Sequence, residues 1–223
     1  MGRPHTPLLD RDRIADAALR LTDRRGDFTI LDLARALKVT PAAIYHHVDG
    51  RAGIITLLRE RMARTVDASG FVHLPWDEAL RRWAISYRET FAAHPGAIQM
   101  LAAEPVADPA VHAMYEQAAT VLQDAGFPRH EVLAVITAVE SFVLGSALDL
   151  AAPPVMVSGI DADATPRLAA AAAATPSGRA RADQAFHLGL DALIAGLHHQ
   201  LSQAGQDRVH PVPGIPAEAT RSR

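Results

Sequence analysis

The side chains able to bind a metal or transfer a proton are two histidine pairs and one carboxylate in an apolar setting. His46 and His47 are adjacent, as are His198 and His199, whereas Glu140 stands in the otherwise apolar stretch 129–150. Neighbours on a helix project about 100° apart, and no second pair is spaced to complete a coordination sphere, so we predict no metal site. A buried carboxylate at Glu140 would need a hydrogen-bond donor from the protein or from a ligand.

Signatures of the common catalytic classes are absent from the sequence. The 223 residues contain no cysteine, which excludes a thiol nucleophile, a disulfide framework and a Cys-built zinc site. They also contain no Gly-x-Ser-x-Gly, no His-Glu-x-x-His and no glycine-rich phosphate loop. We therefore expect no cofactor, and an enzyme that binds a small molecule is kept only as an alternative.

Charge is unevenly distributed along the chain. The formal net charge is −3, but residues 1–68 carry 12 basic and 9 acidic side chains, against 10 and 16 in residues 69–223. The net charge therefore conceals a mildly basic N-terminal part and an acidic C-terminal part. The sequence shows neither a secretory signal nor a run of about 18 uncharged apolar residues, so we predict a cytoplasmic protein that does not enter a membrane.

Apolar residues recur at spacings of three and four along most of the chain, which predicts an all-α fold. The first part is expected to hold helices at about 10–22, 30–37 and 41–48. Thr29 is a predicted helix cap with Asp32 at the reciprocal position, and Thr40 caps the next helix with Pro41 in its first turn. Two short helices joined by a three-residue turn, after a longer helix, are typical of a helix-turn-helix.

A long helix at about 51–69 is expected to join this head to a larger helical region. That region is predicted to contain helices at 75–91, 97–103, 109–125, 129–150 and 180–203, and loops with one short helix in 151–180. Residues 205–223 have too little apolar content to fold. The predicted organisation is a helix-turn-helix domain over 1–50, an effector-binding and dimerisation domain over 51–204, and a disordered tail over 205–223.

Two motifs in the first part carry a family resemblance. Leu33-Ala34-Arg35-Ala36-Leu37 is followed, after a short turn, by Ile44-Tyr45-His46-His47-Val48 and then Arg51. This arrangement resembles the DNA-binding domain of TetR-family transcriptional regulators. The back half is similar to the tetracycline-repressor type of C-terminal domain at Trp76, Glu104-Pro105, Gly126-Phe127, Ser141-Phe142-Val143-Leu144-Gly145 and Phe186-x-x-Gly189-Leu190. Lys38 departs from the family pattern, because the turn usually has glycine there.

The resemblance implies a dimer that binds double-stranded operator DNA with the helix at 41–48 in the major groove. The side chains that it places on the DNA are Pro41, Ala42, Ala43, Tyr45, His46 and His47. Phosphate partners are expected at Thr29, Thr40, Tyr45 and Arg51, since helix starts and a cation suit phosphate oxygens.

The resemblance also implies a small effector that releases the protein from DNA by tilting the fourth helix. We expect an apolar or amphipathic compound bound by Trp83, Tyr87, Phe91, Met100, Met114, Tyr115, Glu140 and Phe142. The magnesium–tetracycline-binding member has a histidine in the region of Met100, and a thioether is a poor ligand for magnesium, so tetracycline is not the expected effector.

Small residues beside apolar seams predict the dimer interface, because two helices approach closely there. The residues of this interface are expected to be Gly145, Ser146, Gly189, Leu193, Gly196 and Leu197. A second alternative remains at this point: a DNA-binding regulator without effector control, whose back half serves only dimerisation.

Overall fold

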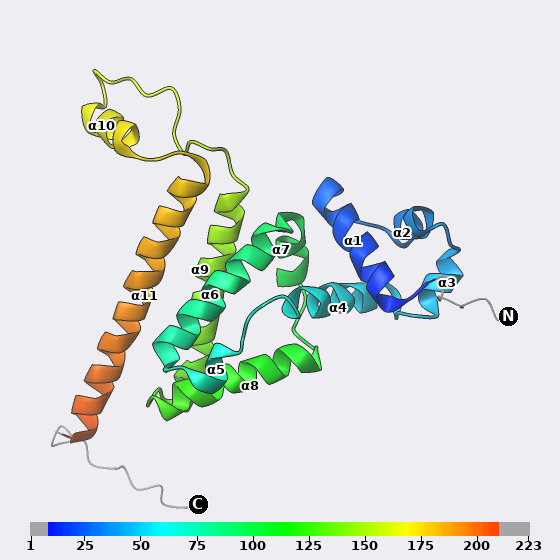
Figure 1. The fold of residues 1–223 in the computed structure, drawn as a ribbon, viewed down its shortest axis with the longest axis horizontal. Helices are drawn as coiled ribbons and strands as arrows, with labels where there is room; N and C mark the ends of the chain where they lie inside the picture. Colours follow the sequence, from blue (N-terminus) through cyan, green and yellow to red (C-terminus); the bar gives the residue numbers. More distant parts are fainter. Residues whose placement is uncertain (1–8, 210–223) are drawn as a thin grey trace, which may run out of the picture.

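The computed structural model describes residues 9–209, which form eleven α-helices and no β-strand (Figure 1). The all-α prediction is therefore confirmed. The helices are α1 (Arg11–Arg25), α2 (Ile30–Leu37), α3 (Pro41–Tyr45), α4 (Gly50–Ala63), α5 (Gly70–His73), α6 (Trp76–Ala92), α7 (Pro95–Ala102), α8 (Pro109–Asp124), α9 (Arg129–Leu150), α10 (Pro166–Ala174) and α11 (Gly178–Val209). Helices α1 to α3 form the small head, and α4 leads from it into the larger body.

Local side-chain chemistry sets the starts of the two short head helices. The Thr29 hydroxyl accepts from the Asp32 amide at 3.1 Å, and the Asp32 carboxylate accepts from the Thr29 amide at 3.2 Å, which completes the predicted capping box. Thr40 accepts from the Ala43 amide at 3.3 Å, with Pro41 in the first turn of α3. The turn between them uses Lys38 at φ 57°, a left-handed conformation that favours glycine.

Helix α3 is shorter than the sequence predicts. It ends at Tyr45, with His46 as its C-cap and His47 in the turn that follows. The amides of His47 and Val48 still bond to the carbonyl of Ile44, so the backbone keeps a helical path for one more turn.

The buried apolar side chains form two cores. The first fills the space between α1, α2, α3, α4 and α7, and it includes Ile54 and Leu58 of α4 together with Ile98 of α7. The predicted domain boundary at residue 50 thus falls inside a continuous core. The second core lies between α5, α6, α8, α9 and α11. Helices α4 and α7 pack on α1 of the head and also contact α8, α6 and α9 of the body, so they connect the two parts.

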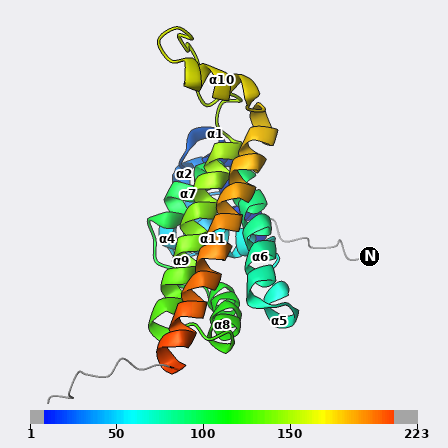
Figure 2. The same cartoon turned by 90° about the vertical axis from the view of Figure 1, so that its left-hand side faces the viewer.

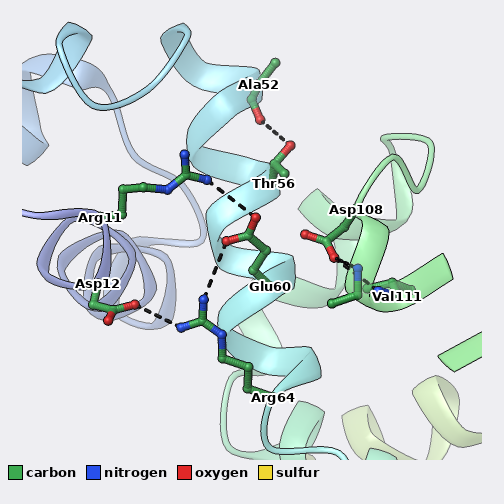
Figure 3. A network of polar contacts seen from close by, with 9 residues as sticks. Arg11, Asp12, Ala52, Thr56, Glu60, Arg64, Asp108 and Val111 are labelled. Atoms are coloured by element: carbon green, nitrogen blue, oxygen red, sulfur yellow. Dashed lines mark hydrogen bonds and ion pairs between the residues drawn. The ribbon is translucent and has the colours of Figure 1, made fainter. Parts of the chain in front are cut away.

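Charged side chains on the surface tie α1 to α4 (Figure 3). Glu60 of α4 pairs with Arg11 at 3.4 Å and with Arg64 at 3.8 Å, and Arg64 reaches Asp12 of α1 at 3.1 Å. Individual exposed pairs of this kind contribute little stability. Together with the shared core, however, they fix the orientation of α1 on α4.

Helices α9 and α11 lie side by side on the outer face of the body, with α10 projecting beyond their ends (Figures 1 and 2). The short helix predicted within 151–180 is α10. Helix α11 continues to Val209, so residues 205–209 are helical where the sequence predicts the start of a disordered tail. The rest of that tail, 210–223, lies outside the described residues.

Candidate DNA-binding surface, effector cavity and dimer face

One side of α3 anchors it to the head and the other side meets solvent. Ile44 is fully buried and Val48 is 8% exposed, whereas Tyr45 is 57% exposed. Ala42 and His46 are also exposed, and His47 is half-buried. The polar ends predicted to read DNA are therefore available, and their backbone is held in place by core residues on the opposite side.

The two threonines predicted to contact phosphate use their hydroxyls inside the head. Thr29 accepts from the Asp32 amide and also donates to the Asp32 carboxylate at 2.7 Å. Thr40 accepts from the Ala43 amide. Both side chains are exposed at helix starts. Their structural role is to cap the N-termini of α2 and α3.

Arg51, predicted as a phosphate-binding cation, is held by groups of its own chain. Its guanidinium donates to the Phe28 carbonyl at 2.6 Å and to the Asp27 carboxylate at 2.6 Å, and lies 4.8 Å from the centre of the Phe28 ring. This bond is the main reason that the pKa of Asp27 is lowered from its ordinary value. Arg51 therefore braces the start of α4 against the α1–α2 turn, and a phosphate would have to compete with these partners.

A cavity of about 180 Å³ lies in the body between α4, α6, α7, α8 and α9. Most of its wall is aliphatic or aromatic, and its polar side chains are Arg59, Tyr87, Tyr115, Glu104 and Glu140. The lining residues are Arg59, Ala63, Val66, Tyr87, Phe91, Ile98, Leu101, Ala102, Glu104, Val106, Val111, Met114, Tyr115, Glu140 and Leu144. An apolar wall with a few convergent polar groups is the usual form of a small-molecule site.

Glu140 is the centre of the polar contacts in this cavity. Tyr115 donates its hydroxyl to Glu140 Oε1 at 2.6 Å. Burial raises the pKa of Glu140, against the opposite effect of hydrogen bonds from Tyr115 and Tyr87 and of the charge of Arg59. Burial also raises the pKa of both tyrosines, and the nearby carboxylate adds to that effect. Both hydroxyls therefore stay protonated and act as donors toward Glu140.

Arg59 connects α4 to the wall of the cavity. Its guanidinium donates to the carbonyls of Leu101 at 2.6 Å, Glu104 at 2.8 Å and Pro105 at 2.7 Å, at the end of α7 and in the loop after it. These bonds tie α4 to the last turn of α7 through Leu101 and to the loop after it through Glu104 and Pro105. Arg59 was not identified from the sequence, because its partners lie more than 40 residues further along the chain and form no motif with it.

Five of the eight predicted effector residues line the cavity, namely Tyr87, Phe91, Met114, Tyr115 and Glu140. The other three predicted residues do not line this cavity. Trp83 lies in the second core against Phe71 and Tyr87, and Met100 lies in the first core beneath α1. Phe142 points toward α11, where it stacks on Phe186 with 5.7 Å between ring centres.

The outer face of α9 and α11 carries small and apolar side chains that α6 and α8 do not cover. A groove of about 550 Å³ between the two helices is lined by three predicted interface residues, Leu193, Gly196 and Leu197. Leu133 and Leu188, on the same pair of helices, are 67% and 72% exposed. By length and composition α9 would also pass as a membrane-spanning helix. It carries Glu140, however, and packs against α6, α8 and α11 as a core helix.

The predicted small interface positions differ in what surrounds them. A Cβ at Gly189 would collide with the Phe142 ring, so this glycine serves the packing of α11 on α9 within the chain. That correction follows from the direction of Phe142, which the sequence spacing does not give. Gly145 and Gly196 have open space around a hypothetical Cβ. Gly145 and Ser146 lie outside the groove.

Among residues 9–209, no three His, Asp or Glu side chains converge in a way that would hold a metal ion. His46 lies at the end of α3 and His198 lies in α11, so the two histidine pairs of the sequence do not form one site. Nε2 of His198 donates to the Asp77 carboxylate at 3.0 Å, and the His198 ring packs on Trp76. Its role in the structure is to join the end of α11 to the start of α6.

Comparison with known proteins gives consistent matches. The family model for the tetracyclin repressor-like C-terminal domain matches residues 74–201. The tetracycline repressor protein class E of Escherichia coli is 29% identical over 203 residues, 87% of this chain and 93% of the repressor. An HTH-type transcriptional regulator of Saccharopolyspora erythraea is 30% identical over 148 residues, 63% of this chain and 60% of that protein. The crystal structure of apo ActR from Streptomyces coelicolor has a TM-score of 0.70 at 25% identity and covers 90% of this chain and 99% of ActR.

Proposed function

The chain belongs to the TetR family of transcriptional regulators, and we propose that it is a dimeric repressor that binds operator DNA through α3 and is released by a small amphipathic effector. The observation that carries this proposal is the division of α3 into two sides. Ile44 of α3 and Val48 of the turn after it lie in the first core, while Tyr45 and the C-cap residue His46 are exposed. For such a DNA-binding role we propose a cytoplasmic location.

A small set of side chains at the exposed end of the head would contact the base edges. Ala42 and Ala43 offer methyl surface to thymine methyls, whereas Tyr45, His46 and His47 supply hydrogen bonds. A single short helix gives too little contact for tight binding, so two heads must act together. The open face of α9 and α11 is the surface that would bring them together, with Leu193, Gly196 and Leu197 at its groove.

Arg59 gives the effector cavity a physical connection to the head. The guanidinium lines the cavity and holds the carbonyls at the end of α7, while its own helix, α4, shares the first core with α1. A ligand that displaces the wall at 101–106 would therefore shift α4 and the head with it. Effector binding and DNA binding must then oppose each other by the same factor.

Selection of bound duplexes from random DNA by the full chain tests the DNA-binding part. We expect the enriched sequences to contain two inverted half-sites whose centres are about one helical turn, roughly 34 Å, apart. Tyr45→Ala combined with His46→Ala is expected to abolish this enrichment while the helical circular dichroism of the protein is retained. Enrichment of the same sequences by this variant would contradict the proposed surface.

A melting screen with small compounds tests effector control separately. A compound that binds the folded protein raises its melting temperature by mass action. The proposal requires that such a compound also lowers operator affinity. Stabilising compounds that leave operator affinity unchanged at saturation would instead support a DNA-binding regulator without effector control.

A further inference from the structure

We infer that the cavity around Glu140 selects a small organic cation, specifically a protonated amine attached to an aromatic or alkyl group about the size of a benzene ring. The inference rests on the proposed effector site and specifies the chemistry of its ligand. The observation behind it is a half-buried carboxylate, beside the aromatic rings of the cavity wall, that forms no ion pair among the described residues.

The charged side chains around the cavity leave Glu140 without a cation in contact. Three lining residues carry charged groups, namely Arg59, Glu104 and Glu140, and Glu104 is exposed to solvent. Arg59 is the one cation among them, and its guanidinium donates to three backbone carbonyls. No ion pair joins it to Glu140 or Glu104 among the pairs formed by residues 9–209. The carboxylate of Glu140 is thus surrounded by hydroxyl donors but lacks a positive charge in contact with it.

A carboxylate that is largely removed from water and has no cation in contact is costly to ionise. Burial disfavours its ionised form, which raises its pKa from the ordinary value. An ammonium group in contact with it would restore the ionised form and gain a charge-assisted hydrogen bond. A neutral ligand would bring no positive charge to this carboxylate, and an anionic ligand would be repelled by it.

The rest of the wall suits the body of such a ligand. Tyr87 and Phe91 stack with 4.4 Å between ring centres, and Tyr115 and Met114 face the same cavity. Aromatic faces attract cations, and methionine adapts to the shape of an apolar group. A dry cavity of about 150 Å³ accommodates benzene, so a volume of about 180 Å³ fits one ring with a short amine-bearing tail.

Isothermal titration calorimetry of the full chain with 2-phenylethylamine and 2-phenylethanol tests the inference. The two probes have the same ring and the same number of non-hydrogen atoms, but only the amine is a cation at pH 7. We expect the amine to bind at least about tenfold more tightly than the alcohol. Equal affinities, or no binding of the amine at millimolar concentration, would overturn the inference.

Two isosteric substitutions show whether Glu140 is responsible. Glu140→Gln removes the charge and is expected to reduce the preference for the amine to less than about threefold, while binding of the alcohol persists. Glu116→Gln is the matched control, because Glu116 is an exposed carboxylate on α8 outside the cavity lining. It is expected to retain the full preference. The same preference in Glu140→Gln as in the unaltered chain would exclude Glu140 as the source.

Operator binding by the same preparations separates this inference from the proposed function. A chain that binds its selected operator but does not prefer the amine refutes the ligand class and leaves the regulator assignment standing. A chain that prefers the amine but enriches no DNA sequence supports the ligand class and refutes the proposed operator binding.

Discussion

Single residues in the head divide into those that hold its shape and those that face outward. Thr29, Asp32 and Thr40 could be assigned from the sequence, because a helix cap depends on residues within three positions of one another. The surroundings of Trp83 and Phe142, which lie in the body, could not be assigned from the sequence. They lie on helices that are apolar on more than one side, and periodicity alone does not say which side meets a cavity and which meets a core.

Lys38 stores backbone strain that can be measured. It is the one non-glycine residue with positive φ among residues 9–209, and its side chain is exposed. Lys38→Gly is expected to raise the free energy of unfolding by about 1 kcal/mol, since relief of the left-handed strain exceeds the added entropy of the unfolded chain. Urea unfolding of the full chain provides the measurement.

Arg35→Gly is the control for this prediction. Arg35 is exposed in the last turn of α2 with helical geometry, so glycine there is expected to lower stability by about 1 kcal/mol. A loss of stability in both variants would show that the backbone at Lys38 is not strained.

Helices α4 and α7 connect the head to the body, and their packing could be predicted only in part. The long fourth helix follows from its apolar periodicity, but it ends at Ala63 instead of continuing to 69. The short α5 was not expected at all. The contact between Arg59 and the end of α7 depends on how two distant segments pack, and no local spacing encodes it.

Removal of the Arg59 side-chain donors is expected to loosen the cavity wall. Arg59→Met keeps an apolar stem of similar length but leaves three carbonyls without their donor. We expect a loss of about 2–3 kcal/mol of stability, as for hydrogen bonds from a charged group. Hydrogen exchange should become faster at 101–108 in particular.

Arg61→Met is the matched control on the same helix. Arg61 pairs with Asp16 at 3.0 Å, and both side chains are about 40% exposed. Such a pair contributes about 1 kcal/mol or less. Equal effects of the two substitutions, or unchanged exchange at 101–108 in Arg59→Met, would argue against a specific role for Arg59.

Helices α6 and α11 are joined by an ion pair whose arginine is buried. Arg88 is 3% exposed in its side chain, donates to Asp183 at 2.6 Å and lies 4.4 Å from the centre of the Phe186 ring. Asp183→Asn is expected to destabilise the protein by about 2 kcal/mol, because it leaves a buried cation without its counter-charge. Arg88→Met removes the cation itself and is expected to have the smaller effect.

The same pair predicts how stability depends on pH. The hydrogen bond from Arg88 lowers the pKa of Asp183 from its ordinary value of 3.8. The pair therefore contributes stability above that pH and loses it as the pH falls through the lowered pKa. Chemical unfolding at pH 7 and at acidic pH should show a smaller loss on acidification for Asp183→Asn than for the unaltered chain. An identical loss would contradict the assignment.

At the scale of the whole molecule, the protein has a head, a linking helix and a body with one uncovered face. The sequence predicts this order, because helix periodicity and the head motifs are local features. The sequence predicts the proposed dimer face only partly, because small residues allow helices to pack closely either within one chain or between two chains. Gly189 does the former, whereas Gly196 lies in the open groove.

A charge placed on the open face should prevent association. Ala138 is an exposed residue of α9 in the groove. Ala138→Arg is expected to convert a dimer at micromolar concentration into a monomer in analytical ultracentrifugation, because an interface core does not tolerate an unpaired charge. Ala113→Arg, at an exposed position of α8, is the control and should remain dimeric. A dimer in both variants would place the interface elsewhere.

Fluorescence anisotropy of the unaltered protein, His46→Ala and His73→Ala tests whether the end of α3 reads operator DNA. The measurement gives the affinity of each full chain for the selected operator and for a scrambled duplex. His46 lies on the outer side of the head, and His73 is an exposed histidine of α5 in the body. The account predicts that His46→Ala weakens operator binding by about tenfold, as expected for a base contact of 1–3 kcal/mol, with little change on the scrambled duplex. It predicts no change on either duplex for His73→Ala. An unaltered ratio of operator to scrambled affinity in His46→Ala would contradict a DNA-reading role for this residue.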